Sequence, residues 1–154
     1  MYPAKNPVGP QVSSDMKEPL DFLKLFFTDE LISEIVRETN YYTTRKLEGK
    51  TLSSRSIWRT WYDVTIEKFW TFIALIINMG TMPLANIQEY WSRNNVSHIP
   101  FYPNTRDRFN QIFWMFHLKT ISSQNTEPRI HLQLVSCFLD YINSKFLDYF
   151  IPGE

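Results

Sequence analysis

The chain has 154 residues, of which 44% are apolar and 16% aromatic, so it can bury roughly two thirds of its unfolded surface as one domain. Sixteen basic residues balance sixteen acidic ones, which excludes a uniformly basic DNA-binding surface and restricts any such surface to a local patch. The single cysteine excludes an intrachain disulfide.

Residues 1–19 are predicted to form a flexible, disordered, Pro-rich tail. Apolar side chains are sparse there, and prolines and a glycine interrupt any helix at Pro3, Pro7, Gly9, Pro10 and Pro19. The folded part is therefore expected over residues 20–154.

Helical signals begin at Pro19, which opens a short apolar stretch. Thr28 is placed to cap a longer helix, with acidic residues in its first turn where the helix dipole favours anions. Its apolar stripe has i, i+3, i+4 spacing, and the helix is expected to end before Gly49. The stripe consists of Leu31, Ile32, Ile35, Val36 and Thr39.

Residues 49–64 are predicted to be a loop anchored by aromatic and apolar side chains. Thr65 caps the next helix, and Val64 with Phe69 can form a hydrophobic staple. This segment is the least polar, so it is expected to be the central helix, with Gly80 as its C-cap. Its predicted core stripe is Phe69, Phe72, Ile73, Ile76 and Ile77.

The remaining elements are also helical. A short helix is expected over residues 84–91, a loop over 94–103, a helix capped by Thr105, a polar loop over 119–128, and a last helix over 129–149 that Pro152 and Gly153 end. The fold class is therefore all-α, an irregular bundle of about five or six helices. The predicted stripes are Phe109, Ile112, Phe113 and Phe116 in one helix and Val135, Phe138, Leu139, Ile142 and Phe146 in the last. Replacing Phe72 or Phe113 with alanine is predicted to cost about 3–5 kcal/mol.

The sequence offers no catalytic or metal site that works alone. Its acidic residues fall mostly in first turns and on polar faces of helices, and His98, His117, His131 and Cys137 lack the paired spacing of a zinc site. His117 is interpreted as a hydrogen-bonded core or interface residue. No phosphate-cradling glycine loop, signal peptide or bilayer-length apolar run occurs. An intracellular, soluble protein without cofactor, membrane contact or enzyme activity of its own is expected.

One segment has the composition of a DNA-backbone contact. Residues 45–59 carry five basic side chains against the single Glu48, interspersed with hydroxyl groups and flanked by Trp58 and Trp61. Cations neutralise phosphates, and hydroxyls can donate hydrogen bonds to phosphate oxygens. An ordinary solvated loop is the alternative. The candidate contacts are Arg45, Lys46, Lys50, Arg55 and Arg59.

Arg106 and Arg108 are a second candidate pair. They lie in a predicted first turn beside Asp107, where cations oppose the helix dipole. They either contact a DNA phosphate or belong to an ion-paired, buried helix start.

Several motifs together resemble the front of piggyBac-like transposases. They are residues 20–32 (LDFLKLFFTDELI), 38–41 (ETNY), 79–83 (MGTMP) running into 89–92 (EYWS), and 105–109 (TRDRF) running into 116–118 (FHL). In that family a Pro-Gly pair like Pro152-Gly153 precedes the first strand of the nuclease core, which carries the first catalytic aspartate. The chain thus resembles the helical dimerisation and DNA-binding region before the catalytic domain.

The resemblance implies a nuclear cut-and-paste transposase that acts at TTAA sites. The family's RNase H-like core holds three aspartates and a divalent metal such as Mg²⁺, and a Cys-rich zinc domain commonly follows. No position of this sequence matches those aspartates or zinc ligands. The resemblance further implies that a later segment completes this module, so apolar surface is expected to be left uncovered.

Three hypotheses remain open from the sequence. The chain is a partial transposase module that binds DNA, forms a homodimer, or pairs with a full-length transposase. Alternatively, it is a domesticated module for protein interaction, or an inactive remnant. Salt-sensitive DNA binding favours the first hypothesis, partner binding without DNA affinity the second, and a poorly soluble, molten-like state the third.

Overall fold

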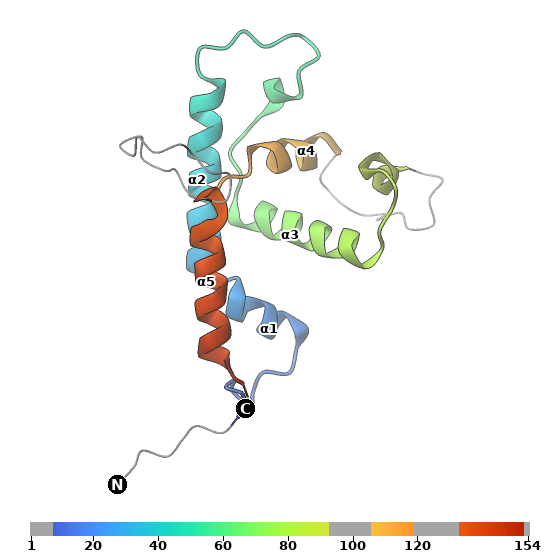
Figure 1. The fold of residues 1–154 in the computed structure, drawn as a ribbon. Coiled ribbons are helices and arrows are strands. Elements are labelled where there is room, and N and C mark those ends of the chain that lie inside the picture. Colours follow the sequence, from blue (N-terminus) through green and yellow to red (C-terminus); the bar gives the residue numbers. More distant parts are fainter. Residues whose placement is uncertain (1–7, 93–105, 119–132, 153–154) are drawn as a thin grey trace. The chain divides into compact units, whose positions relative to one another are not determined.

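The computed structural model describes residues 8–92, 106–118 and 133–152 (Figure 1). The all-α fold class is confirmed, since helices dominate this part of the chain and strands contribute only two residues each. None of the described helices is both long and apolar enough to cross a membrane. The elements are β1 Gly9–Pro10, α1 Pro19–Phe26, α2 Asp29–Leu47, η1 Ile57–Thr60, α3 Ile66–Thr81, η2 Ile87–Trp91, α4 Arg106–Met115, α5 Gln133–Tyr149 and β2 Phe150–Ile151, where η marks a 3₁₀ helix.

The chain forms two compact units. One comprises Met1–Leu31 and Ile121–Glu154, and the other comprises Ile32–Thr120. The division falls in the first turn of α2. We call them the terminal unit and the central unit.

The core of the central unit is built from α2, α3 and α4. Its most buried apolar side chains, all at most 2% exposed, include Ile32 of α2, Phe69 and Leu75 of α3, and Phe109 and Ile112 of α4. Aromatic side chains pack α3 against α4, since the ring centroids of Phe72 and Phe109 lie 5.2 Å apart. Burial of such large rings dominates core energetics.

Two predicted helix starts are confirmed by their hydrogen bonds. The Thr28 hydroxyl accepts from the backbone N–H of Leu31 at 3.3 Å, and the Thr65 hydroxyl accepts from that of Lys68 at 3.3 Å. Each side chain therefore satisfies an otherwise unpaired donor in the first turn of its helix.

Two predictions for α3 are wrong. Gly80 is not a C-cap, because the helix continues to Thr81 and the N–H of Met82 donates to the Asn78 carbonyl. Ile76 and Ile77 are 41% and 46% exposed, so they do not belong to the core, whereas Leu75 is buried. Within the described residues, α3 buries one face and leaves apolar side chains on the other.

Consecutive residues of α2 hold two distant segments of the central unit. The Asn40 amide donates to the Val64 carbonyl at 2.9 Å and accepts from the Val64 N–H at 2.8 Å. The Thr39 hydroxyl lies 3.3 Å from the His117 carbonyl oxygen and 3.1 Å from its backbone nitrogen. These polar contacts connect α2 to the chain before α3 and to the chain after α4.

A buried tyrosine organises the turn after α3. The Tyr90 hydroxyl of η2 accepts from the Leu84 N–H at 2.9 Å and lies 3.2 Å and 3.0 Å from the carbonyl oxygens of Met79 and Met82. Its neighbour Trp91 packs against Phe109, with ring centroids 5.2 Å apart. The segment predicted as a helix over 84–91 is thus a shorter 3₁₀ helix fixed by these contacts.

In the terminal unit, α1 packs on α5. The ring of Phe26 lies 4.9 Å from that of Phe146, and the ring of Phe27 lies 6.4 Å from that of Phe138. The Tyr141 hydroxyl meets the Thr28 hydroxyl at 3.4 Å. These contacts join sequence segments more than a hundred residues apart.

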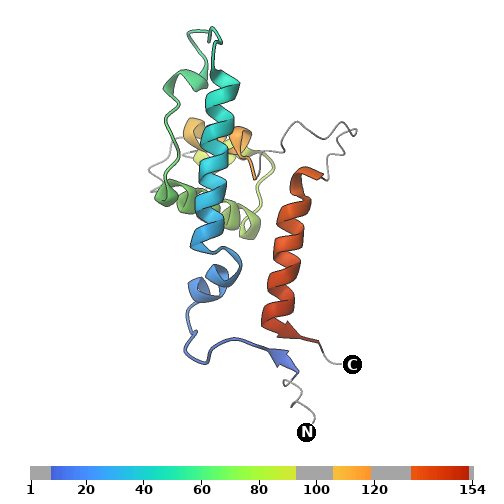
Figure 2. The same ribbon diagram turned by 90° about the vertical axis from the view of Figure 1, so that its left-hand side faces the viewer.

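Residues 9 and 10 of the predicted tail are more ordered than the sequence predicts, because β1 pairs antiparallel with β2 (Figure 2). Gly9 is opposite Ile151, and the Gln11 N–H donates to the Tyr149 carbonyl at 2.8 Å. The predicted stripe of α5 is only partly covered in the described residues, since Leu139 is 50% and Phe146 is 55% exposed. The predicted loops at 94–103 and 119–128 and the Thr105 cap lie outside the described residues.

Candidate nucleic-acid interface

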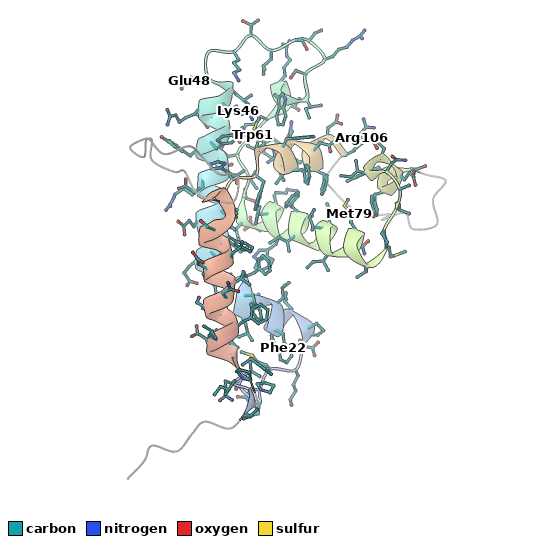
Figure 3. All side chains as sticks on the ribbon, in the orientation of Figure 1. Phe22, Lys46, Glu48, Trp61, Met79 and Arg106 are labelled. Atoms are coloured by element: carbon teal, nitrogen blue, oxygen red, sulfur yellow. The ribbon has the colours of Figure 1, made fainter. Side chains whose placement is uncertain are left out.

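The five candidate cations of residues 45–59 all have exposed side chains in the central unit. Arg45 and Lys46 stand in the last turn of α2, Arg59 stands in η1, and the other two lie on the connection between these helices. We call Arg45, Lys46, Lys50, Arg55 and Arg59 the basic patch. Figure 3 labels Lys46 beside the C-terminal end of α2.

Aromatic side chains one turn earlier orient the first two cations. The Arg45 guanidinium donates to the Tyr41 hydroxyl at 3.2 Å and lies over its ring, and the Lys46 ammonium donates to the Tyr42 hydroxyl at 2.9 Å. Such i, i+4 pairs restrict long side chains while leaving other donors of each cation for a ligand. Both cations also complement the negative end of the helix dipole.

A glycine turns the chain at the end of α2. Gly49 has a φ of +68°, a left-handed conformation that side chains with a Cβ rarely adopt. The Lys50 N–H donates to the Leu47 carbonyl at 3.2 Å. The turn therefore brings Lys50 close to the last turn of the helix, near Lys46.

Within the described ranges, no member of the basic patch forms an ion pair. The ion pairs found there join Arg37 to Glu34 and Glu38, and Arg106 to Asp107. The patch is thus a local cluster of exposed cations in a chain whose formal charge is zero.

The structure removes Arg108 from the candidate DNA contacts. Its side chain is 5% exposed, and its guanidinium donates to the Gln111 side chain at 3.0 Å and to the Asp63 carbonyl at 3.3 Å. It also lies 3.8 Å from the centroid of the Tyr62 ring. Burial lowers the pKa of this guanidinium, and the neighbouring Tyr62 and Asp63 oppose that shift.

Arg108 and Gln111 instead position the segment that carries Arg59. The Gln111 amide donates to the Ile57 carbonyl and, at 3.1 Å, to the Thr60 hydroxyl. Both acceptors belong to η1. Of the predicted ion-paired, buried helix start, the burial is confirmed for Arg108, and the two hydrogen bonds given above go to an amide and a carbonyl.

Replacing Arg108 with lysine tests this positioning role. Lysine keeps the charge but lacks the planar fork that reaches two acceptors, so the free energy of unfolding should fall by about 1–3 kcal/mol. Urea denaturation measures this loss. An Arg106→Lys variant, altered at an exposed position, should retain wild-type stability, and equal stability of both variants would contradict the role.

Arg106 differs from Arg108. Its side chain is 53% exposed and lies 3.6 Å from the Asp107 carboxylate, so its charge is partly balanced locally (Figure 3). The geometry leaves it accessible but separates it from the basic patch by its place at the start of α4.

A cleft adjoins the basic patch. It has a volume of about 290 Å³, and its walls come from the end of α2, the connection after it, η1 and the end of α4. Trp114, an aromatic residue off the predicted stripe of α4, is 66% exposed. The lining residues are Lys46, Leu47, Lys50, Leu52, Trp58, Trp114 and Met115.

The described acids do not form a metal centre. Among residues 8–92, 106–118 and 133–152, no three His, Cys, Asp or Glu side chains are grouped so that they could hold a metal ion. Asp29, Glu30, Glu67 and Asp107 lie in first turns of helices. The hydrogen bond from the Thr65 side chain and that of its own backbone lower the pKa of Glu67. His117, which the sequence suggested is a hydrogen-bonded core or interface residue, stacks on Tyr42 with ring centroids 4.3 Å apart.

A family model described as Transposase IS4 matches residues 18–154, which is most of the chain. The chain belongs to this family and, within it, to the piggyBac-like transposases.

Three human proteins are among the curated relatives, and two of them are named as derived from piggyBac transposable elements. PiggyBac transposable element-derived protein 5 is 25% identical over 142 residues, covering 88% of this chain and 25% of the relative. PiggyBac transposable element-derived protein 3 is 25% identical over 141 residues, covering 90% of this chain and 21% of the relative. The chimeric ERCC6-PGBD3 protein has the same identity over 141 residues, which are 12% of its length. The chain spans a quarter or less of these relatives, and no solved structure matches it.

Proposed function

We propose that this chain is a DNA-binding module of a piggyBac-like transposase. The basic patch of this module contacts the phosphate backbone. The observation that carries the proposal is a cluster of five exposed cations without an ion-pair partner among the described residues. Lys and Arg side chains of this kind neutralise phosphates and release bound counterions. Contacts to the backbone position a protein on DNA without reading its sequence.

The proposed module works in the nucleus and performs no catalysis of its own. Two-metal phosphoryl transfer needs carboxylates that converge from separate elements. The acids Asp29, Glu30, Glu67 and Asp107 lie instead in first turns of helices, where they stabilise the dipole. Activity would then depend on pairing with a full-length transposase, and a homodimer of the module is the other assembly that we propose.

Reversal of two charges tests the backbone contact. Arg55→Glu combined with Arg59→Glu should weaken binding to duplexes of unrelated sequence alike and reduce the steepness of its salt dependence by about two counterions. These positions are exposed, so the fold should persist. Fluorescence anisotropy with several duplexes over a salt series measures both effects.

A matched control makes the same change in net charge elsewhere. Lys17 and Lys24 are exposed in the terminal unit, so Lys17→Glu with Lys24→Glu should leave duplex binding close to wild type. A loss restricted to one DNA sequence would contradict backbone contact. Equal losses in both double variants would show that net charge, not the patch, determines affinity.

A protein-interaction module is the second candidate function. Exposed apolar side chains favour it, among them Ile76 and Ile77 on α3 and Phe113 on α4, which are 41%, 46% and 46% exposed. Exposed apolar patches commonly mark interfaces. Partner binding or self-association of a well-folded chain without affinity for DNA would favour this alternative, whereas a molten-like state would indicate an inactive remnant.

A further inference from the structure

The cleft beside the basic patch combines features that backbone binding does not require. Two lysines, Lys46 and Lys50, line it together with two tryptophans, Trp58 and Trp114, and none of its lining residues is acidic. Leu47, Leu52 and Met115 complete an apolar wall. Contact to the phosphate backbone of DNA requires cations, but it does not require a cleft lined by aromatic and apolar side chains.

We infer that this cleft binds an unpaired nucleotide of single-stranded DNA. The base stacks on the Trp114 indole, and the adjoining phosphate pairs with the ammonium groups of Lys46 and Lys50. The inference rests on the proposed DNA-binding function. It adds single-stranded DNA as a second ligand of the surface that includes the basic patch. Proteins that bind single strands combine a basic groove with aromatic side chains on which bases stack.

The size of the cleft favours one base. Its volume of about 290 Å³ is at the lower end of the range, roughly 300–1,000 Å³, that small-molecule sites occupy. A space of this size suits a single flat ring system. It is too small to enclose a duplex or a whole partner helix, whose diameter with side chains is about 10–12 Å.

The chemistry of the walls favours an unpaired base over a duplex. In a duplex the faces of the bases are stacked on one another, and only their edges are open in the grooves. A base must leave the stack before it can lie on an indole ring. Trp114 is 66% exposed and meets the Phe113 ring edge to face, with centroids 5.6 Å apart, so its indole can accept a stacked base.

The two lysines that line the cleft supply positive charge beside this stacking surface. The Lys46 ammonium donates to the Tyr42 hydroxyl at 2.9 Å, which leaves two of its three donors for a phosphate. Neither Lys46 nor Lys50 pairs with an acid among the described residues. A phosphate next to a bound base would therefore meet uncompensated positive charge.

The test compares single-stranded and duplex DNA in one binding assay. Trp114→Ala should weaken binding of a dT oligonucleotide about 5- to 150-fold, the loss that follows from removing one stacked base, and change duplex affinity less than about twofold. An oligonucleotide of the same length whose sites are abasic should bind the wild type and the variant alike. Phe22→Ala, which removes a ring that is 42% exposed in α1, is the matched control and should change neither affinity.

The other outcomes distinguish this inference from the proposed function. Wild-type duplex binding with no loss of single-strand affinity in Trp114→Ala overturns the inference and leaves backbone contact standing. Equal loss for both DNA forms also overturns it, because the ring would then serve duplex binding. Absence of all DNA binding overturns both proposals. Self-association that disappears in Trp114→Ala, without single-strand affinity, assigns the cleft to a second copy of the chain.

Discussion

Replacing Phe72 with alanine is expected to lower the free energy of unfolding by about 3–5 kcal/mol. Phe72 is 6% exposed, and its ring packs between Phe69, Phe109 and Phe116, with centroid distances of 5.8, 5.2 and 6.4 Å. Truncation removes these contacts and leaves a cavity between α3 and α4. Because small domains are stable by only about 5–15 kcal/mol, the loss is a large fraction of the total. Urea unfolding followed by tryptophan fluorescence measures it.

Phe113→Ala is the matched control, and the structure corrects the prediction that Phe113 is a core residue. The apolar stripe predicts the same large loss at this position, but the Phe113 side chain is 46% exposed. Its ring still stacks near Phe109, at 6.0 Å, so the expected cost is about 1 kcal/mol. Equal stability losses in the two variants would contradict the core described for the central unit.

Replacing Asn40 with alanine is expected to cost about 2–4 kcal/mol, although the removed group is small. The Asn40 amide satisfies both the N–H and the carbonyl of Val64, at 2.8 and 2.9 Å, and Val64 is only 2% exposed. Alanine leaves two backbone groups without a partner at a site that water barely reaches. The loss therefore exceeds that of one ordinary hydrogen bond.

Hydrogen exchange gives this prediction a local readout. The Val64 amide should exchange faster in Asn40→Ala than global destabilisation alone explains. Asn143 is exposed on α5, so Asn143→Ala should change stability by no more than about 0.5 kcal/mol. Wild-type protection of the Val64 amide in Asn40→Ala would show that the two hydrogen bonds do not hold this segment.

Local signals in the sequence predicted much of the fold. Thr28 and Thr65 were identifiable as N-caps because capping depends on a side chain and the next few backbone groups. The end of α2 before Gly49 was also predictable, because it depends on the conformational preference of a single glycine. The exposure of Ile76 and Ile77 was not predictable in this way, since periodicity shows an apolar face but not how much of it neighbouring helices cover. The pairing of β1 with β2 joins two segments about 140 positions apart in the sequence. Each strand has only two residues, which is too few for a periodic pattern that would predict a strand.

The motifs that resemble the family turn out to support the scaffold. Thr39 and Asn40 hold distant backbone segments, Tyr90 holds the turn after α3, and Arg108 is buried and donates to the Asp63 carbonyl. Substitutions at these positions are therefore expected to lower the stability of the fold. The candidate DNA contacts are different, because they are exposed cations whose only signal was local composition. Trp114 was missed because it lies off the helical stripe.

The most direct test of the central claim is the affinity of the wild-type chain for a mixed-sequence DNA duplex across a salt series. If the five cations of the basic patch contact phosphates, the logarithm of the association constant should fall linearly with the logarithm of salt concentration, with a slope of about −4 to −5. Absence of binding at low salt, or binding whose affinity does not change with salt, would contradict the assignment of this module to the DNA backbone.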